Sequence, residues 1–376
     1  MQVSNHRRLF ALAMAVGLAA GACSGSAASP TSAPAASSAA TPAAQSVAPA
    51  SAAPASAAAS AGAVQFPTPE KTSVKIALSV VSEPSQYAEK LAQQLGLYQK
   101  YGLTVEVVGF EGDGKSVQAL MAGQVDYMVV GVSSVINTLT TDTPTKAISM
   151  NSILVNDALF CRADIKTAAD AKGKIFAVST FGGTSHGSVL MALNALGLKP
   201  SDVTITQVGG QSERIAALKG GSIGCAPADA SLQPELEKLG FNMLVNLAAS
   251  GQTWGRSGLA TKVDTLKSMP NTTLAVQAAI LEAQNSIWLD TPTAISKFME
   301  FTTQTQDQAT TAINSFLKTG DRTMMFDQKA FQAPAQTLAA VQPAIANVDL
   351  TQAYDLSFLQ KLADMGFYKQ INDPLP

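Results

Sequence analysis

The sequence predicts an α/β fold of two lobes, each a mostly parallel sheet flanked by helices, followed by a helical C-terminal region. Three observations lead to this prediction. Short β-branched runs alternate with helical patterns through the first two thirds of the chain, this alternation occurs twice, and the last third is mostly helical. Strand–helix–strand alternation is typical of parallel sheets with helices on their faces.

The first lobe is predicted from five segments that alternate in type. Residues 74–80, 103–110 and 125–130 have the composition of strands, and residues 87–99 and 115–122 have the apolar spacing of helices. Together they describe one βαβαβ unit.

The second lobe is predicted from a repeat of the first. "KIALS", which begins at Lys75, returns as "IFAVS" from Ile175, and apolar and glycine positions between 105 and 125 recur at one constant spacing between 203 and 223. A repeat after about one hundred residues indicates a second unit of the same plan.

After about Gly251 the apolar spacing predicts helices rather than strands. We expect this region to return to the first lobe and pack around it. Pro292 stands at the first turn of the second of these helices, a position that proline favours. The predicted helices span 274–289, 293–303, 308–317, 328–341 and 356–365.

The length of the chain supports a division into lobes. About 310 residues follow residue 66, which exceeds the usual size of a single hydrophobic core. We predict a first lobe over 67–158, a second over 159–250, and the return to the first lobe over 251–376.

The first residues predict export. Basic His6, Arg7 and Arg8 precede an apolar run that ends just before Cys23, an order typical of a signal peptide over 1–23. The run is shorter than the roughly 20 residues that a membrane-spanning helix needs. Residues 24–66 consist mainly of Ala, Ser and Pro and carry no charge, so we predict a disordered tether.

The stretch from Leu18 to Cys23 resembles the lipobox of bacterial lipoproteins, although Ala20 stands where that pattern usually has Leu. The resemblance implies that Cys23 carries lipid and anchors the chain to the outer face of the cytoplasmic membrane or in the periplasm. The alternative is an ordinary cleaved signal with an incidental cysteine.

The other two cysteines, Cys161 and Cys225, lie in apolar surroundings and are far apart in sequence. We expect two buried thiols, although an exported protein can also form a disulfide. We expect no metal and no cofactor, because metal ligands are not clustered. The net charge of −2 and the lack of a basic run argue against nucleic acid as a partner.

Ligands of open α/β sheets bind where strands end and the chain enters helices. That rule selects the loops 79–85, 110–114, 131–134, 179–185 and 209–212. Two further candidates lie outside these loops. The candidate binding residues are Ser79, Ser82, Glu83, Phe110, Glu111, Gly131, Ser133, Thr180, Gly183, Thr184, Ser185, Gln211, Ser212, Asp229 and Trp254.

The segment "STFGGTSHGS", residues 179–188, gives the strongest signal for a ligand. Gly182 and Gly183 allow close approach of the backbone, and Thr184 or Ser185 would cap a helix whose first turn has no acidic residue. Such a helix end favours a small anion. The alternative is an ordinary capped helix.

The charged and aromatic candidates favour different kinds of solute. Glu83 and Glu111 would favour an amine if both face the ligand, whereas Arg214 and Lys115 would supply positive charge. Trp254 could stack on a ligand or belong to the core.

The same segment contains G-x-S-x-G as "GTSHG", the pattern of a hydrolase nucleophile. A serine nucleophile needs a separate histidine base held by an acid. Besides His6 the chain has only His186, next to Ser185, and neighbours on a helix point away from each other. We therefore expect no catalytic residues and no enzyme.

Two stretches carry a family resemblance. "GLYQKYGLTVEVVGFEGDGKSVQALMAGQVDY", residues 96–127, and "AADAKGKIFAVSTFGGTSHGSVLMALNALGLKPSDVTI", residues 168–205, resemble the solute-binding proteins of sulfonate, nitrate and taurine importers and the thiamine-pyrimidine-precursor binders. The matching positions include Gly96, Tyr98, Gly102, Leu103, Ala119, Leu120, Gly123, Asp126, Asp170, Gly173, Lys174, Ser185, His186, Gly197, Leu198 and Asp202.

The resemblance implies a type II periplasmic-binding-protein fold, a two-lobed clamshell with solute between the lobes. The two crossing segments would fall near 156–162 and 247–255. It further implies an anionic or aromatic solute that is sulfonate-, nitrate- or pyrimidine-like, a monomer, and an ABC permease and ATPase as partners. Leu232, where taurine binders tend to have an aromatic residue, argues against taurine itself. A lyase or dehydratase on the same fold and a tethered ligand-sensing receptor are the alternatives.

Overall fold

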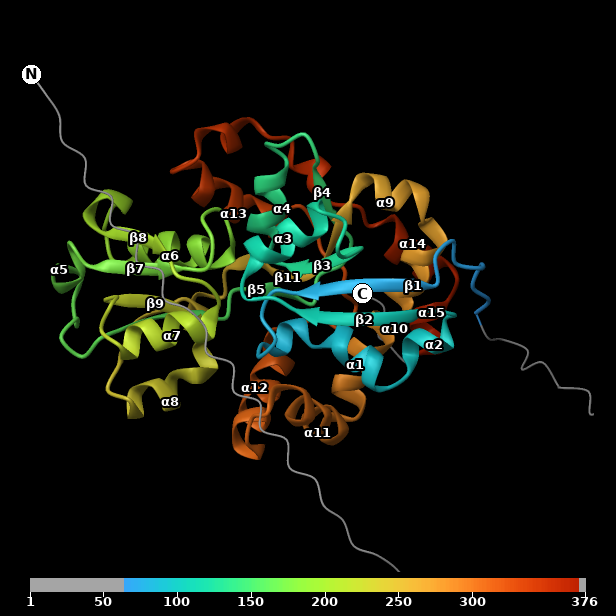
Figure 1. Ribbon diagram of the computed structural model, residues 1–376, viewed down its shortest axis with the longest axis horizontal. Coiled ribbons are helices and arrows are strands. Elements are labelled where there is room, and N and C mark those ends of the chain that lie inside the picture. Colours follow the sequence, from blue (N-terminus) through green and yellow to red (C-terminus); the bar gives the residue numbers. More distant parts are fainter. Residues whose placement is uncertain (1–63, 372–376) are drawn as a thin grey trace, which may run out of the picture. The chain divides into compact units, whose positions relative to one another are not determined.

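The computed structural model describes residues 64–371 (Figure 1). The predicted signal peptide, Cys23 and nearly all of the predicted tether lie outside the described residues. Within the described part, the chain forms two sheets with helices on their faces, as the sequence predicts, and both sheets are mixed.

The first sheet has the strand order β2-β1-β3-β11-β4, and β5 pairs with β11 at one side. Strand β1 is parallel to both β2 and β3, whereas β11 is antiparallel to β3 and β4. The strands are β1 (Ser73–Leu78), β2 (Thr104–Gly109), β3 (Tyr127–Val130), β4 (Thr145–Ala147), β5 (Ser152–Leu154) and β11 (Thr253–Lys262). This sheet and the helices packed on it are the first lobe.

The second sheet has the order β10-β6-β9-β7-β8. Strand β7 is parallel to β8 and β9, whereas β6 is antiparallel to β9 and β10. The strands are β6 (Asp157–Cys161), β7 (Ile175–Val178), β8 (Thr204–Gln207), β9 (Cys225–Asp229) and β10 (Asn242–Asn246). This sheet and its helices are the second lobe.

The repeat seen in the sequence is confirmed by the topology, because β2-β1-β3 in one sheet corresponds to β8-β7-β9 in the other. The prediction of mostly parallel sheets is right only for these repeated units. The strands beside them, β11, β6 and β10, run antiparallel. They belong to the segments that leave one lobe and enter the other, where no crossover helix sets a parallel direction.

Successive residues of β1 point to opposite faces of the sheet, as in any strand, and pack into different cores. Ile76 and Leu78 pack with α10, while Ala77 on the other face packs with Phe331 of α13. The first-lobe helices are α1 (Ala88–Gln94), α2 (Leu97–Lys100), α3 (Asp113–Met121), α4 (Val132–Thr138), α9 (Val263–Ser268), α10 (Pro270–Leu289), α11 (Thr291–Thr302), α12 (Gln306–Thr319), α13 (Lys329–Ala339), α14 (Ser357–Asp364) and α15 (Phe367–Gln370).

The helices of the second lobe are α5 (Ala168–Ala171), α6 (Thr184–Ala195), α7 (Gln211–Lys219) and α8 (Gln233–Lys238). The single helix predicted over 87–99 is wrong in one respect, because α1 and α2 are separate. Gly96 lies between them with a φ of 71°, a left-handed conformation that ends a helix.

The expectation of two buried thiols is wrong, because Cys161 and Cys225 form a disulfide. The two residues lie directly opposite each other on the antiparallel strands β6 and β9, with Cα atoms 4.1 Å apart. Sequence spacing carries no information on this register, which brings together residues that are 64 positions apart.

Two segments connect the lobes. One joins β5 to β6 through residues 155–156, and the other joins β10 to β11 through residues 247–252. The first crossing predicted, over 156–162, is misplaced, since most of that range is strand β6. Within the described residues no helix has the length and apolar character needed to cross a membrane.

Candidate functional site

The loops that follow the parallel strands of the two lobes lie against each other. A Cβ atom added to Gly112, in the loop after β2, would come 2.9 Å from the Cβ of Ser179, in the loop after β7. In the same way, a Cβ atom added to Gly114 would collide with Thr180, and one added to Gly131 would collide with Thr184. The strand-end loops of both lobes therefore meet in one cleft.

The N-terminus of α6 in the second lobe binds Asp113 from the first lobe. The Asp113 Oδ2 atom accepts hydrogen bonds from the Thr184 main-chain N–H at 3.1 Å and from the Thr184 hydroxyl at 2.6 Å. It also accepts one from the Ser134 hydroxyl at 2.8 Å. The cap position itself is Gly183. The prediction that Thr184 or Ser185 caps the helix is therefore wrong.

Ser185 and His186 interact with residues other than each other. The Ser185 hydroxyl accepts the Ser179 main-chain N–H at 2.8 Å and is hydrogen-bonded to the Ser179 hydroxyl. His186 Nδ1 accepts the Gly182 N–H at 3.0 Å, and burial lowers the pKa of the imidazole. The G-x-S-x-G pattern thus forms the start of α6, and the Ser185 and His186 side chains hold the preceding loop, residues 179–182.

A buried charged cluster links Asn156 of the first connecting segment to β11, the strand that follows the second. Arg256 on β11 lies 2.7 Å from the Glu83 carboxylate and 3.1 Å from that of Asp157, the first residue of β6. Its Nε donates to Asn156 Oδ1 at 2.8 Å, and Asn156 Nδ2 donates to Asp229 Oδ2 at 2.7 Å.

Burial shapes the protonation of this cluster. Burial raises the pKa of Glu83 to about 7 in spite of the opposing effect of the Arg256 charge. It also raises the pKa of Asp229. Burial opposes the charge of Arg256, but the carboxylates of Asp157, Glu83 and Asp229 together raise the pKa of this guanidinium. Arg256 is therefore a permanent cation.

Sequence reasoning missed Arg256, Asn156 and Asp157. Their only sequence signal is their position. Arg256 is the one charged residue in the run "TWGRSGLAT", Asn156 directly precedes β6, and Asp157 begins it. A charge in an otherwise uncharged strand is a weak indication, because it does not name the partner.

A cavity of about 500 Å³ opens between the lobes and is called the cleft cavity below. Ser82 and Pro84 contribute from the loop after β1, and Gln211 and Ser212 contribute from the start of α7. Its remaining lining comes from α7, from the end of β9 and the turn after it, from α8 and from the segment around the start of α12: Ile215, Asp229, Ser231, Leu232, Pro234, Glu235, Leu236, Lys238, Gln304, Thr305, Asp307, Gln308, Thr311 and Ala312.

The cleft cavity includes the predicted residues Ser82, Gln211, Ser212 and Asp229. Sequence reasoning missed its wall from α12, which was expected only to pack on the first lobe. Gln308 on α12 donates to the Glu235 carboxylate on α8 at 3.1 Å, and this contact bridges the lobes beside the cavity.

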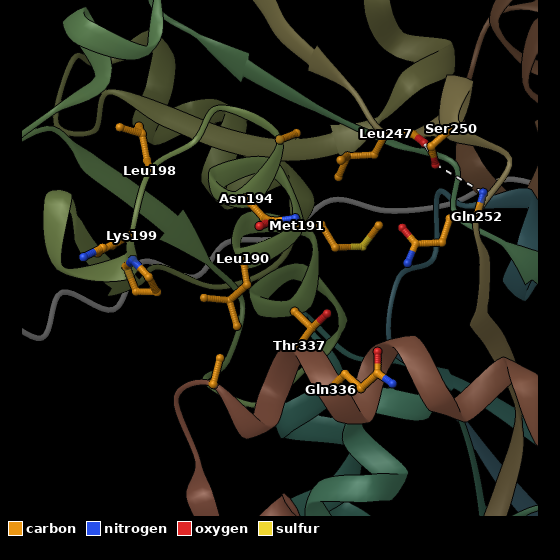
Figure 2. A pocket seen from close by; sticks show the side chains of 13 residues that line it. Leu190, Met191, Asn194, Leu198, Lys199, Leu247, Ser250, Gln252, Gln336 and Thr337 are labelled. Atoms are coloured by element: carbon orange, nitrogen blue, oxygen red, sulfur yellow. Dashed lines mark hydrogen bonds between the residues drawn. The ribbon is translucent and has the colours of Figure 1, made fainter.

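A second cavity of about 480 Å³ lies between α6, the connecting segment 247–252 and α13 (Figure 2). Figure 2 shows Met191 of α6 between Gln252 and the α13 residues Gln336 and Thr337. This α6–α13 cavity contains none of the predicted binding residues and none of the five loops selected from the sequence, and Lys199 is its single charged lining residue.

The remaining predicted residues have varied positions. Trp254 is fully buried among the apolar side chains of the second lobe, and Phe110 packs against the first-lobe core. The Ser79 hydroxyl donates to the Val129 carbonyl at 2.8 Å. Ser133 is buried next to Gly187 of α6. Lys115 and Glu111 are exposed.

Arg214 is buried, and its guanidinium donates to the carbonyls of Gly209 and Pro227. It therefore fixes the start of α7 to strand β9. Within residues 64–371 there is no group of His, Cys, Asp and Glu side chains that could hold a metal ion.

A family model described as "NMT1/THI5 like" matches residues 87–310, more than half of the chain. The chain belongs to this family. The matched range runs through both sheets and both connecting segments, and it includes every residue of the buried charged cluster except Glu83.

Known relatives agree with the family. The taurine-binding periplasmic protein of Escherichia coli is 30% identical over 239 residues, which is 61% of this chain and 72% of that protein. A binding protein of Brucella abortus is 31% identical over 119 residues, which is 31% of this chain. The chain thus aligns with 36% of the length of that relative.

Solved structures share the fold. A Bordetella bronchiseptica protein matches with a TM-score of 0.71 at 19% identity, covering 82% of this chain and 100% of that one. The alkanesulfonate-binding protein of Xanthomonas axonopodis pv. citri, bound to MOPS, matches with a TM-score of 0.61 at 16% identity over 73% and 95% of the two chains. The type II periplasmic-binding-protein fold predicted from the sequence is thereby confirmed.

Proposed function

We propose that this chain is an exported solute-binding protein that encloses one small molecule between its lobes and delivers it to an ABC permease and ATPase. The observation that carries the proposal is the cleft cavity, whose walls come from strand-end loops of both lobes. Its volume of about 500 Å³ is within the range of small-molecule sites, which is roughly 300–1,000 Å³.

The connections between the lobes support a hinge. Only the segments 155–156 and 247–252 link the two sheets along the chain, so a few backbone rotations there can separate the lobes. The hydrogen bond from Arg256 to Asn156 ties strand β11, which follows the second segment, to the first segment, and this would make the two connections move together. Solute that contacts both walls of the cavity would stabilise the closed form.

The contacts of the predicted residues suggest their roles in binding. Gln211 accepts the Asp229 main-chain N–H at 2.9 Å, which leaves its amide nitrogen free to donate to solute. Ser82 in the first lobe and Ser212 in the second would supply hydroxyls from opposite walls. We propose these three residues and Asp229 as the solute contacts.

The relatives named for taurine and alkanesulfonate support transport rather than catalysis. The hydrogen bonds of Ser185 and His186 also favour a binding protein, since neither side chain is placed as a nucleophile or its base. We further propose that lipid at Cys23 anchors the chain and that residues 24–66 serve as its tether. Mass spectrometry of the exported protein would test the lipid.

The test is ligand-induced stabilisation of the full chain. Sulfonates, nitrate, aromatic carboxylates, pyrimidines and small amines would be screened by thermal unfolding, and small-angle scattering would follow lobe closure. A binding compound should raise Tm in a concentration-dependent manner. Gln211→Ala should weaken its binding at least tenfold, whereas Thr337→Ala in the α6–α13 cavity should not. The reverse pattern would place the solute in the other cavity and defeat the proposal.

A further inference from the structure

The end of α6 that the sequence marks as an anion site holds a carboxylate of the same chain. Asp113, which is 5% exposed, accepts the first N–H of α6 and the hydroxyls of Thr184 and Ser134. Helix N-termini attract negative charge, and α6 has no acidic residue in its own first turn. The Asp113 carboxylate of the first lobe thus occupies the helix end of the second lobe that could bind an anion.

The same loop of the first lobe places a second carboxylate near another helix end. Gly210 is the cap residue of α7, and a Cβ atom there would collide with the Glu111 carboxylate. The Gly210 N–H is already used by Glu213 within the helix, at 2.7 Å. Glu111 and Asp113 therefore bring negative charge to both helix ends that face the first lobe.

The cleft cavity offers an anion little compensation. Its charged lining residues are Asp229, Glu235 and Asp307 against Lys238. The buried guanidinium of Arg256 is already paired with Glu83 and Asp157, and that of Arg214 on α7 donates to the carbonyls of Gly209 and Pro227. An anion in the cavity would face more carboxylates than cations, and its charge would be repelled.

We propose that Asp113 sets the charge selectivity of the cleft, by filling the α6 anion site so that the closed protein accepts a solute whose polar group is neutral or positively charged. This inference rests on the proposed function, because it assumes that solute binds between the closed lobes. Among the solutes considered from the sequence, it favours a pyrimidine or an amine over a sulfonate or nitrate.

The physical reason lies in the closing motion. Asp113 belongs to the first lobe and Thr184 to the second, so their contact forms only when the lobes meet. An anion bound at Thr184 in the open form would lie where the Asp113 carboxylate arrives on closing. The two negative groups cannot share one set of donors, and the anion-bound protein would stay open.

The test compares the full-length wild type with Asp113→Asn, which keeps the shape of the side chain and removes its charge. Binding of methanesulfonate and nitrate is measured by calorimetry at pH 7, with ethylammonium as the cationic probe. We expect Asp113→Asn to bind methanesulfonate at least tenfold more tightly than the wild type. Asp113→Glu, which restores the charge, should keep the weak anion binding of the wild type.

Two comparisons protect the result from a purely structural explanation. Glu106→Gln removes an exposed carboxylate on β2 and should leave the affinity for all three probes unchanged. Asp113→Ser provides a second uncharged variant should Asp113→Asn fold poorly. The inference is wrong if the wild type binds methanesulfonate as tightly as either uncharged variant, or if neither variant gains anion affinity.

The outcomes separate this inference from the proposed function. If wild-type protein binds an anion and closes around it, the solute-binding function stands and the selectivity assigned to Asp113 falls. If no compound of any charge changes Tm or the scattering profile of the wild type, the solute-binding function falls, whatever the variants do.

Discussion

The Arg256 guanidinium, on the strand that returns the chain to the first lobe, lies 2.7 Å from the carboxylate of Glu83 in the loop after β1. Asp157, at the start of the second lobe, is the second carboxylate on the same nitrogen, at 3.1 Å. All three side chains are buried. One cation thereby connects both lobes, through strands that directly follow the two connecting segments.

Replacing this cation should be costly. Arg256→Met leaves the buried carboxylates of Glu83 and Asp157 without a cation and with only the hydroxyls of Ser85 and Ser188 as donors. Breaking one side of a buried ion pair destabilises proteins by about 3–5 kcal/mol. Urea unfolding measures the loss. Arg162→Gln, which removes an exposed ion pair with Asp164, should change stability by about 1 kcal/mol or less. A loss for Arg256→Met as small as that of the control would contradict the role assigned to the cluster.

Glu89 should make stability depend on pH. This carboxyl is buried on α1, where its side-chain hydrogen bonds come from Asn151 Nδ2 at 3.1 and 3.2 Å, and burial raises its pKa to about 7. In the unfolded chain the carboxyl ionises near its usual pKa, whereas in the folded protein it stays protonated. Stability from this group is therefore full at low pH and is lost as the pH rises from about 4.3 to 7, by roughly 3 kcal/mol.

The Glu89 variant that tests this is Glu89→Gln, which cannot ionise and keeps an oxygen for Asn151. Its free energy of unfolding should fall less between pH 4.5 and pH 7 than that of the wild type. Glu83, whose pKa burial also raises, should contribute in the same direction in both proteins. Parallel pH profiles for wild type and Glu89→Gln would show that Glu89 is ionised in the folded state.

The disulfide should stabilise the second lobe. Cys161 and Cys225 close a loop of 64 residues across β6 and β9, and native disulfides of this kind contribute about 2–5 kcal/mol. Cys161→Ala with Cys225→Ala should lower the free energy of unfolding by that amount. Adding a reductant should lower Tm of the wild type towards that of the double variant and leave the double variant unchanged. Equal stability with and without reductant would refute the contribution.

A single methyl group should prevent full closure of the cleft. Gly114 lies in the first turn of α3, and a Cβ atom there would come 3.0 Å from the Cβ of Thr180 in the other lobe and closer to its methyl group. Gly114→Ala meets nothing else that close, so each lobe should fold normally. We expect a larger radius of gyration and weaker solute binding, about tenfold or more.

The control for Gly114→Ala is Gly220→Ala, at the end of α7, where the added methyl makes ordinary contacts within one lobe. Combining Gly114→Ala with Thr180→Gly should restore closure. If scattering shows the same dimensions for Gly114→Ala and Gly220→Ala, the loops after β2 and β7 do not meet as closely in solution.

Much of the fold could be predicted from the sequence, because the local spacing of apolar residues indicates which side of a helix or strand is buried. The repeated βαβαβ unit and the C-terminal helices follow from apolar spacing. Ser82, Gln211 and Ser212, which line the cleft cavity, were selected as candidates because ligands of such sheets bind at strand ends. The helix over 87–99 was predicted as continuous because Leu95 and Tyr98 keep the apolar spacing past Gly96, whereas the chain there adopts a left-handed turn.

Tertiary structure decided the pairings. Sequence alone determined an α/β chain of two similar units with polar loops at the strand ends. It could not place Asp113 at the end of α6, Arg256 between Glu83 and Asp157, or Cys161 opposite Cys225. Each of those contacts joins residues far apart in the chain, and its geometry depends on how strands register and how lobes close. The spacing of residues along the chain does not reveal strand register or lobe closure, because hydrogen bonds and ion pairs depend on distances of a few ångströms in space.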